Sequence, residues 1–373
     1  MQSSAASIGN IGNNIPDLMT AAQQVGYGDA KDALQLKSDV TVPKELKASQ
    51  VLVRNHAVSI NAIDWKLLNG NMSIIKTYAF PHIPGMDCSG IVVNVGSSVG
   101  RLKVGDAVYG NMGYGNAFAE YVRADESLFA LKPVNLSFAE AAAVPLAGET
   151  AYEALFQQRE ITRDSKVFIC GGPTGVGLFG IQLAKAVGAH VACTSSLRNM
   201  DTIKKLGYNV TENISEVMKP NNDDLLVIDY TKYNFGEILH HQNYDVVFDC
   251  VGGQEQWESA QQILKPGGRF ITIVGDDPHS NLTVKNIVTM GAGVINRKFW
   301  SLVGQEPSYI FHILKHDYRH LDDMRVNYIE TGKMKPIIDH VYDFYNVKEL
   351  HEMYDRSKSG KAQGKMVAQI IKD

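Results

Sequence analysis

The sequence predicts an α/β protein that combines a doubly wound parallel sheet with a second, β-rich domain. Three observations support this fold class. At 373 residues the chain is too long for one compact core, so two domains are expected. Residues 21–130 carry short β-type runs separated by Gly and Pro, whereas strands and helices alternate from about Pro145 onward. A glycine turn at 171–177 joins an apolar run to a helical pattern.

This glycine turn is the most informative motif of the chain. The apolar run 167–170 precedes it, a helical pattern at 178–187 follows, and a second apolar run begins at His190. The order strand, glycine turn, helix, strand is typical of a dinucleotide-binding βαβ unit, in which backbone N–H groups at the helix start face a pyrophosphate. The residues expected to contact the nucleotide here are Gly172, Thr174, Gly175, Val176 and Gly177.

The β-rich part is predicted from period-two and apolar runs bounded by turn residues. The predicted strands are 50–59, 89–96, 107–109, 118–123 and 128–131. A helix is predicted at 137–143, because Ser137 is a suitable N-cap and Glu140 stands at the capping-box spacing.

The alternating part continues beyond the glycine turn. Its predicted strands are 191–194, 226–230, 246–250 and 270–274, and the polar segment 211–224 is expected to be a surface excursion. In the tail we predict a helix at 309–330, a strand at 337–344, a helix at 347–357 and a final strand at 365–371.

Composition excludes several classes of partner. The chain has 20% charged and 45% hydrophobic residues, a net charge of −4 and no run rich in Lys or Arg, so no nucleic acid partner is expected. No stretch of 18 apolar residues occurs, so no membrane span is expected. The four cysteines form no C-x-x-C pair and are expected to be buried and reduced, as in a reducing compartment.

The first eighteen residues are small and polar, and are expected to form a disordered extension. They contain no arginine and no long apolar core, which makes them a poor targeting signal. A cytoplasmic location is therefore expected, with a mitochondrion or plastid as the alternative.

The end of the second strand of the βαβ unit favours NADPH over NADH. Ser195, Ser196 and Arg198 follow this strand, and no carboxylate occurs before Asp201. Hydroxyl groups and a guanidinium suit a 2′-phosphate, whereas an acidic residue would repel it. The alternative is a solvated turn with an exposed Arg198. Val251 and Gly252, which follow the predicted strand 246–250, are expected to approach the cofactor as well.

No motif predicts a metal site. The eleven histidines and four cysteines include no H-E-x-x-H motif and no cluster with ligand spacing. The proximity of His82 and Cys88 in the sequence is interpreted as chance.

Several segments together resemble the medium-chain dehydrogenase/reductase superfamily over residues 19–373. They are 61–66, 81–110, 145–152, 172–177, 249–253 and 264–270. Zinc alcohol dehydrogenases carry Gly-His-Glu where this chain has Gly85-Met86-Asp87, and Asn61 stands near their cysteine ligand. The sequence is therefore similar to the zinc-free branch, the quinone oxidoreductases and alkenal or enone reductases.

The resemblance implies a division of the chain and an assembly. A GroES-like catalytic domain at 19–144, completed by 304–373, would follow the disordered extension at 1–18, and a Rossmann NADPH-binding domain would occupy 145–303. A homodimer is also implied by the resemblance.

The resemblance further implies hydride transfer from NADPH to a quinone or an α,β-unsaturated carbonyl. Asn61, Asp64 and Lys66 would lie at the substrate mouth, Thr150 near the nicotinamide, and Tyr230 at the adenosine phosphate. Lys66 would stabilise an enolate oxygen or donate a proton, and Asp64 would keep it charged if the two lie close together. The alternatives are a surface Lys66 paired with Asp64, a mitochondrial-type enoyl-thioester or quinone-pathway reductase, and a protein that binds NADPH without turnover.

Overall fold

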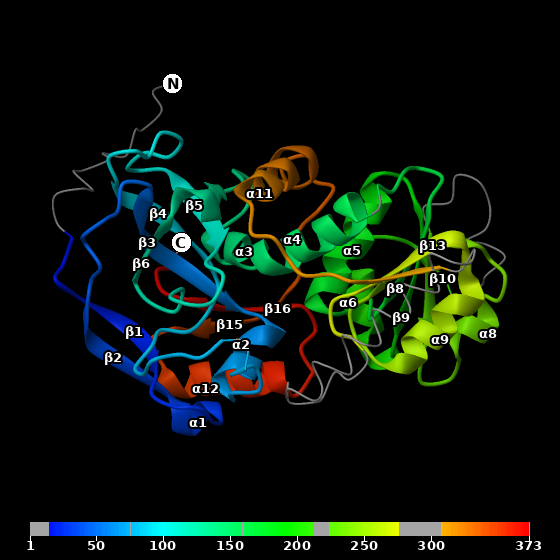
Figure 1. Cartoon of the computed structure of the whole chain (residues 1–373), viewed down its shortest axis with the longest axis horizontal. Coiled ribbons are helices and arrows are strands. Elements are labelled where there is room, and N and C mark those ends of the chain that lie inside the picture. The colour runs from blue at the N-terminus through cyan, green and yellow to red at the C-terminus, as the bar shows by residue number, and fades with distance from the viewer. Residues whose placement is uncertain (1–14, 75, 159, 212–223, 276–306, 373) are drawn as a thin grey trace.

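The computed structural model describes residues 15–74, 76–158, 160–211, 224–275 and 307–372. Two lobes lie side by side in Figure 1, a β-rich lobe that contains both ends of the described chain and a lobe built on a parallel sheet. Residues 1–14 of the predicted extension lie outside the described residues, and so does the predicted domain boundary at 303/304.

The parallel sheet confirms the predicted doubly wound lobe. Its strand order is β10-β11-β9-β8-β12-β13-β14, and every neighbouring pair is parallel. The strands are β8 (Lys166–Cys170), β9 (His190–Ser195), β10 (Val210–Thr211), β11 (Leu225–Asp229), β12 (Tyr244–Asp249), β13 (Leu264–Thr272) and β14 (Ser308–Phe311). The helices α5 (Gly175–Ala186), α6 (Met200–Lys204), α8 (Phe235–Ile238) and α9 (Gln254–Ile263) belong to this lobe, together with the 3₁₀ turn η3 (Leu197–Asn199).

The predicted helix at 309–330 is wrong over its first part. β14 pairs with β13 at the edge of the sheet, and the helical residues begin only with α11 (Tyr318–Met324), which continues into the π-helical turn η4 (Arg325–Ile329). Four residues are too few for periodicity to distinguish a strand from a helix. Residues 308–311 form a strand because their backbone pairs with the edge of β13.

The β-rich lobe confirms most of the predicted strands. Its main sheet runs β15-β16-β3-β4-β5-β7, with β6 paired to β3, and β1 and β2 form a separate antiparallel pair. The strands are β1 (Leu18–Gln24), β2 (Leu34–Thr41), β3 (Gln50–Ile60), β4 (Asp87–Val95), β5 (Ala107–Asn111), β6 (Tyr121–Asp125), β7 (Phe129–Leu131), β15 (Ile338–Asp343) and β16 (Lys365–Gln369). The helical segments are α1 (Ala30–Ala33), α2 (Ala62–Leu68), η1 (Glu126–Leu128), α3 (Phe138–Ala142) and α12 (Val347–Lys358).

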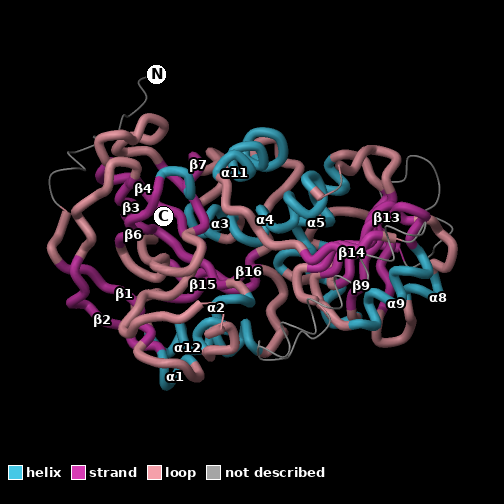
Figure 2. Tube along the Cα trace, in the orientation of Figure 1, coloured by secondary structure: helices cyan, strands magenta, loops and turns pink. Residues whose placement is uncertain are grey.

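Two helical passages join the lobes. α4 (Pro145–Tyr152) continues into the π-helical turn η2 (Glu153–Gln157) and leads the chain toward the parallel sheet, while α11 and η4 lead it back (Figure 2). The buried Tyr109 hydroxyl of β5 donates to the carbonyl of Leu321 in α11 at 2.8 Å. The return passage is therefore held on the β-rich lobe by a buried hydrogen bond.

Candidate active site

The strand order reverses between β8 and β12, and the region beyond the carboxyl ends of these two strands is called the crevice below. From β8 the chain winds outward through β9 to β10 and β11, and it then crosses to β12 on the other side. In open parallel sheets, ligands bind beyond the carboxyl ends of the strands at such a reversal. The glycine turn after β8 and the Val251–Gly253 turn after β12 both lie at this point.

The turn after β8 is shaped by close backbone contacts. Gly171 has a φ of +80°, and a Cβ at Gly177 would lie only 2.2 Å from the Gly171 carbonyl oxygen. Thr174 is the N-cap of α5, since its Oγ1 accepts from Gly177 N at 3.0 Å and donates to Gly171 O at 2.8 Å. Gly175 and Val176 then begin α5, where N–H groups have no acceptor one turn back in the helix.

The turn after β12 is held by a buried carboxylate. Asp249 Oδ1 accepts from Val251 N at 3.1 Å and from Gly252 N at 2.9 Å, and Thr272 Oγ1 donates to Asp249 Oδ2 at 2.7 Å. A Cβ at Gly171 would lie 2.4 Å from Val251 Cγ1. The two turns that flank the crevice are therefore packed directly against each other.

The residues predicted at the adenosine end come together at the ends of β9 and β11. Tyr230 N donates to the Ser195 carbonyl at 3.1 Å, and the Tyr230 side chain is 58% exposed. The Ser196 hydroxyl is buried and has no hydrogen-bond partner among the described residues, and Arg198 is exposed. Ser195 differs, because its hydroxyl is buried and donates to the carbonyl of Ser196.

At the predicted substrate mouth, two residues at the start of α2 are hydrogen-bonded to each other. Asn61 precedes the helix and its N–H donates to Asp64 Oδ2 at 2.7 Å. The Lys66 ammonium lies 5.8 Å from the centre of the Trp65 ring, and burial lowers the pKa of Lys66. Among the described residues no ion pair joins Lys66 to Asp64, as expected for residues two apart on a helix, which point to different faces.

Sequence reasoning missed two charged residues that complete this region. The buried Lys365 of β16 donates to the carbonyl of Ile60 at 3.1 Å and also to Asn61 Oδ1, and it lies 3.5 Å from Asp87 Oδ2. A Cβ at Gly175 would lie 3.1 Å from Lys365 Cδ, so this lysine also touches the start of α5. A lysine at the start of a predicted strand carried no sequence signal for such a role, because 278 residues separate it from Asp87.

Asp87 links this cluster to α4. Its Oδ2 accepts from Asn61 Nδ2 at 2.8 Å and its Oδ1 from Leu146 N at 3.0 Å. One turn later in α4, Thr150 Oγ1 donates to the carbonyl of Leu146 at 2.7 Å and is buried. The structure thus brings Asn61, Asp64 and Thr150 into one connected region, and within the described residues no side-chain hydrogen bond joins Lys66 to it.

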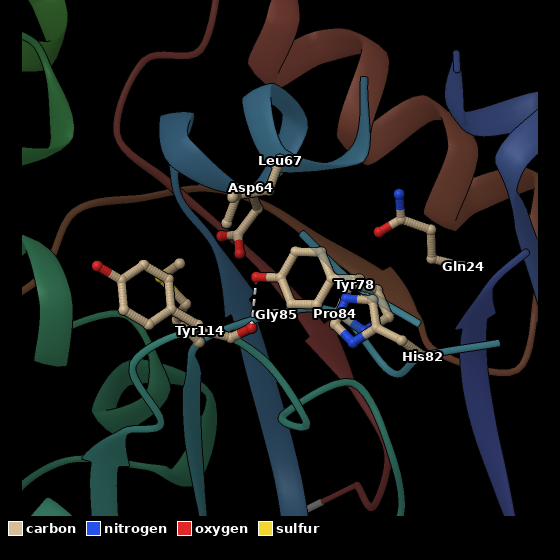
Figure 3. Close-up of a pocket in the computed structure, with 9 residues that line it drawn as sticks. Gln24, Asp64, Leu67, Tyr78, His82, Pro84, Gly85 and Tyr114 are labelled. Carbon is tan, nitrogen blue, oxygen red and sulfur yellow. Dashed lines mark hydrogen bonds between the residues drawn. The ribbon is translucent and has the colours of Figure 1, made fainter. Parts of the chain in front are cut away.

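A small cavity of about 10 Å³ lies beside Asp64, which is room for about one water molecule. Its lining comes from the β1 end, α2 and the loops before β4 and after β5: Gln24, Asp64, Leu67, Tyr78, His82, Pro84, Gly85, Met86 and Tyr114. Figure 3 shows the Asp64 carboxylate and the Tyr78 hydroxyl directed toward each other, with Tyr114 beside them. The Tyr78 hydroxyl donates to the Tyr114 carbonyl at 2.7 Å, and its ring stacks on His82 at 3.9 Å.

Met86 stands in this lining at the position of the histidine expected in zinc enzymes, and it is 1% exposed. Cys88 is buried in β4, where burial raises the pKa of its thiol. Within the described ranges, no three His, Cys, Asp or Glu side chains gather so as to hold a metal ion. In the same ranges no helix is both long and apolar enough to cross a membrane.

The glycine turn at the strand reversal and the buried polar cluster beside it are the arrangement expected of a nucleotide-dependent oxidoreductase. Comparisons with known proteins identify the family. Residues 47–134 match the family described as "Alcohol dehydrogenase GroES-like domain", and residues 225–367 match "Zinc-binding dehydrogenase". A "2-methylene-furan-3-one reductase" of Solanum lycopersicum is 34% identical over 96% of this chain and 81% of its own. An "NADPH-dependent alkenal/one oxidoreductase, chloroplastic" of Arabidopsis thaliana is 33% identical over 87% of this chain and 73% of its own.

A solved structure supports the same family assignment. The "quinone oxidoreductase from Coxiella burnetii" superimposes with a TM-score of 0.74 at 27% identity, and the match covers 95% of this chain and 99% of that one. The chain therefore belongs to the medium-chain dehydrogenase/reductase superfamily, among its quinone oxidoreductases and alkenal/enone reductases. The GroES-like lobe and the Rossmann-type sheet predicted from the sequence are both confirmed.

Proposed function

We propose that the protein is an NADPH-dependent reductase that transfers hydride to the electron-poor carbon of an enone, an enal or a quinone without a catalytic metal. The observation that carries the proposal is the glycine turn at the strand reversal, packed against the turn after β12 and next to the buried Asn61–Asp87–Lys365 cluster. When bound, NADPH supplies the hydride. The protein orients the cofactor and the substrate, excludes water from the site and stabilises the charge that develops.

Several features of the crevice suit the pyrophosphate. The N–H groups that begin α5 at Gly175 and Val176 have no acceptor one turn back in the helix, and the N-terminal end of a helix attracts negative charge. Gly172, Thr174 and Gly177 form the tight turn that presents them. The side chain of Lys365 packs against Gly175, since its Cδ would lie 3.1 Å from a Cβ at that position.

The choice of NADPH rests on the end of β9. The buried hydroxyl of Ser196, which has no partner among the described residues, and the exposed guanidinium of Arg198 are groups that bind a 2′-phosphate. The backbone of Tyr230 is hydrogen-bonded to Ser195, which precedes Ser196. Ser195 contributes through its carbonyl, which accepts from Tyr230 N. Val251 and Gly252 bound the crevice from the β12 side.

At the reacting end we assign Asn61, Asp64, Lys66 and Thr150 to the substrate region. Hydride addition to an enone leaves negative charge on the carbonyl oxygen, and an ammonium stabilises that charge strongly in a site that excludes water. Lys66 is the proposed source of this charge. Its amine is partly buried and therefore less well hydrated than a surface lysine.

The test is a panel of enals, enones and quinones with NADPH and with NADH, followed at the nicotinamide absorbance. We expect turnover with NADPH and a clear preference over NADH. Lys66→Ala should lower kcat on enones by more than about tenfold, a modest loss for an electrostatic stabiliser. Lys348→Ala on the exposed side of α12 is the control and should leave kcat unchanged. An unchanged kcat in Lys66→Ala would remove Lys66 from the reaction, and absence of NADPH oxidation across the panel would refute the function.

The assembly and location are proposed with the same function. We expect a homodimer, as the family resemblance implies, which light scattering on the purified protein measures. We expect a cytoplasmic location, with plastid or mitochondrion as the alternative; imaging of a tagged full-length chain distinguishes them.

A further inference from the structure

The buried cluster at the substrate mouth contains one cation and two carboxylates. Lys365 is 4% exposed, Asp87 0% and Asp64 2%. Three acceptors surround the Lys365 nitrogen, namely Ile60 O, Asn61 Oδ1 and Asp87 Oδ2. A neutral amine has only two hydrogens, so three acceptors require the ammonium form. If both carboxylates were ionised, the cluster would hold one uncompensated buried negative charge, which is costly.

The hydrogen-bond donors decide which carboxylate carries a proton. Asp87 accepts from four groups, which is the arrangement of an ionised carboxylate: Ser59 Oγ at 3.2 Å, Asn61 Nδ2 at 2.8 Å, Leu146 N at 3.0 Å and Lys365 Nζ at 3.5 Å. Asp64 accepts only from Asn61 N through Oδ2, and its buried Oδ1 has no partner among the described residues. A proton on Asp64 Oδ1 removes the excess charge and gives this oxygen a donor role.

Asp64 lines the cavity next to Met86 and Tyr114, at the mouth to which the proposed function assigns the substrate. The cavity has room for about one water molecule, and Tyr114 in its lining is 47% exposed, so a water in it lies between Asp64 and a substrate held outside. We propose that Asp64 is held protonated in the resting enzyme and supplies, through one water molecule in this cavity, the proton that the reduced substrate takes up. This proposal rests on the proposed function and replaces the earlier expectation that Lys66 donates the proton.

The hydride that bound NADPH supplies leaves with the electron pair of a nicotinamide C–H bond, which breaks to give NADP⁺, and forms a C–H bond at the β-carbon of the enone. The π electrons of the enone move onto the carbonyl oxygen to give an enolate. The α-carbon then takes a proton from the water in the cavity as that water takes the proton of Asp64 Oδ1, so one O–H bond of the water and the O–H bond of Asp64 break, a new O–H bond of the water and a second C–H bond form, and the carbonyl is restored. Asp64 is left as a carboxylate, and a proton from solvent returns it to the resting state.

The groups around Asp64 agree with an acid that works near neutral pH. The pKa of Asp64 is raised to about 7, because burial, together with the nearby Asp87 charge, outweighs the opposing effects of the Asn61 hydrogen bond and the Lys365 charge. His82 in the same cavity is neutral at pH 7, because burial and Lys76 lower its pKa to about 4. The titratable groups that face Asp64 from the surrounding elements are Asp87 of β4, Lys365 of β16, Tyr354 of α12, and Tyr78 and His82 of the loop before β4.

The first experiment follows the α-proton. An enone with an α-substituent is reduced in D₂O with NADPH, and the configuration of the new α-C–D centre is determined. The wild-type enzyme should place deuterium on one face of the α-carbon. Asp64→Asn keeps an oxygen that can accept from Asn61 N but has no acidic proton, so it should give both configurations, with kcat lowered by roughly 10²-fold. The wild-type kcat should also fall as pH rises through about 7, and that decline should be absent from the variant.

Asp125→Asn is the matched control, because Asp125 also accepts a backbone N–H, from Ser127 at 3.0 Å, but lies away from the cavity. It should retain the wild-type kcat and stereochemistry. Asp64→Asn that keeps a single α-configuration and the wild-type pH profile would overturn the proposal.

A second measurement needs no turnover. Infrared difference spectra of the resting wild-type protein against Asp64→Asn should show a carboxylic acid C=O stretch that disappears as pH rises through about 7, and the comparison separates Asp64 from the buried Glu149 and Asp249, whose pKa values burial also raises. No such titrating band would overturn the proposal. If this band is present but no enone or quinone is reduced, the proposed function fails while the protonation of Asp64 stands.

Discussion

At the scale of single residues, the site depends on a few buried polar side chains that are far apart in sequence. Lys365 holds Asn61 and Asp87 together and contacts the start of α5 at Gly175. A buried ion pair of this kind contributes modestly when intact, because desolvation offsets the attraction, but breaking it is costly because one charge remains buried alone.

We therefore expect Lys365→Met to lower the free energy of unfolding by about 3–5 kcal/mol in chemical denaturation. The double variant Asp87→Asn/Lys365→Met removes both charges and should be more stable than Lys365→Met alone. If Lys365→Met unfolds within about 1 kcal/mol of the wild type, the pair does not hold the cluster together.

At the scale of elements, two helices begin with similar hydroxyl N-caps that have different expected consequences. Thr174 caps α5 in the cofactor crevice through Gly177 N at 3.0 Å. Ser137 caps α3 in the β-rich lobe through Glu140 N at 3.2 Å, and Glu140 returns a bond to Ser137 N at 2.8 Å. Both caps satisfy N–H groups that the helix leaves free, but only the first shapes the turn at the crevice.

Thr174→Ala and Ser137→Ala should each lower the unfolding free energy by about 1 kcal/mol. Only Thr174→Ala should also weaken NADPH binding, measured by nucleotide fluorescence titration, and Thr174→Ser should restore it. Equal nucleotide affinity in both alanine variants would separate the α5 cap from cofactor binding.

At the scale of the whole molecule, a second buried cluster joins the two passages between the lobes. Glu153 at the start of η2 accepts from Lys315 N at 3.2 and 3.1 Å. His312 Nε2 lies 3.4 Å and His320 Nδ1 3.1 Å from the Glu153 carboxylate, and Gln158 faces His312 Nδ1 at 3.4 Å. The chain leaving the β-rich lobe is thus tied to the chain returning to it.

The buried His312 makes the contribution of this cluster to the free energy of unfolding depend on pH. Burial lowers the pKa of His312 below its ordinary 6.5, and Glu153 only partly opposes this. The unfolded chain therefore binds this proton more readily than the folded one, so its contribution to stability is present above pH 6.5 and is lost as pH falls toward the lower folded-state pKa.

The stability advantage of the wild type over His312→Gln should accordingly shrink between about pH 7.5 and about pH 5.5, in denaturant titrations at each pH. His351→Gln, which replaces a histidine that contacts the Leu34 carbonyl in the β-rich lobe, serves as the comparison. A difference between wild type and His312→Gln that grows on acidification would contradict the assignment of a lowered pKa.

Much of the fold could be predicted from the sequence, because its signals are local. The apolar runs around β8 and β9, the glycine turn between them and the Ser137 capping box each act within a few residues, and the structure reproduces them. The strand at 308–311 could not be predicted in this way, since only the neighbouring β13 edge distinguishes it from the start of a helix.

The same distinction between local signals and contacts that need the folded chain applies to the candidate site. The sequence by itself determined the family and the glycine turn, whereas the short helix α2 that carries Asp64 became visible only in the structure. Only the tertiary structure decided which charges meet, namely that Lys365 pairs with Asp87 across 278 residues and that Asp64 Oδ1 has no partner in the described part of the chain. Backbone conformation follows from neighbouring residues, whereas the state of a buried charge depends on desolvation and on partners that only the folded chain brings together.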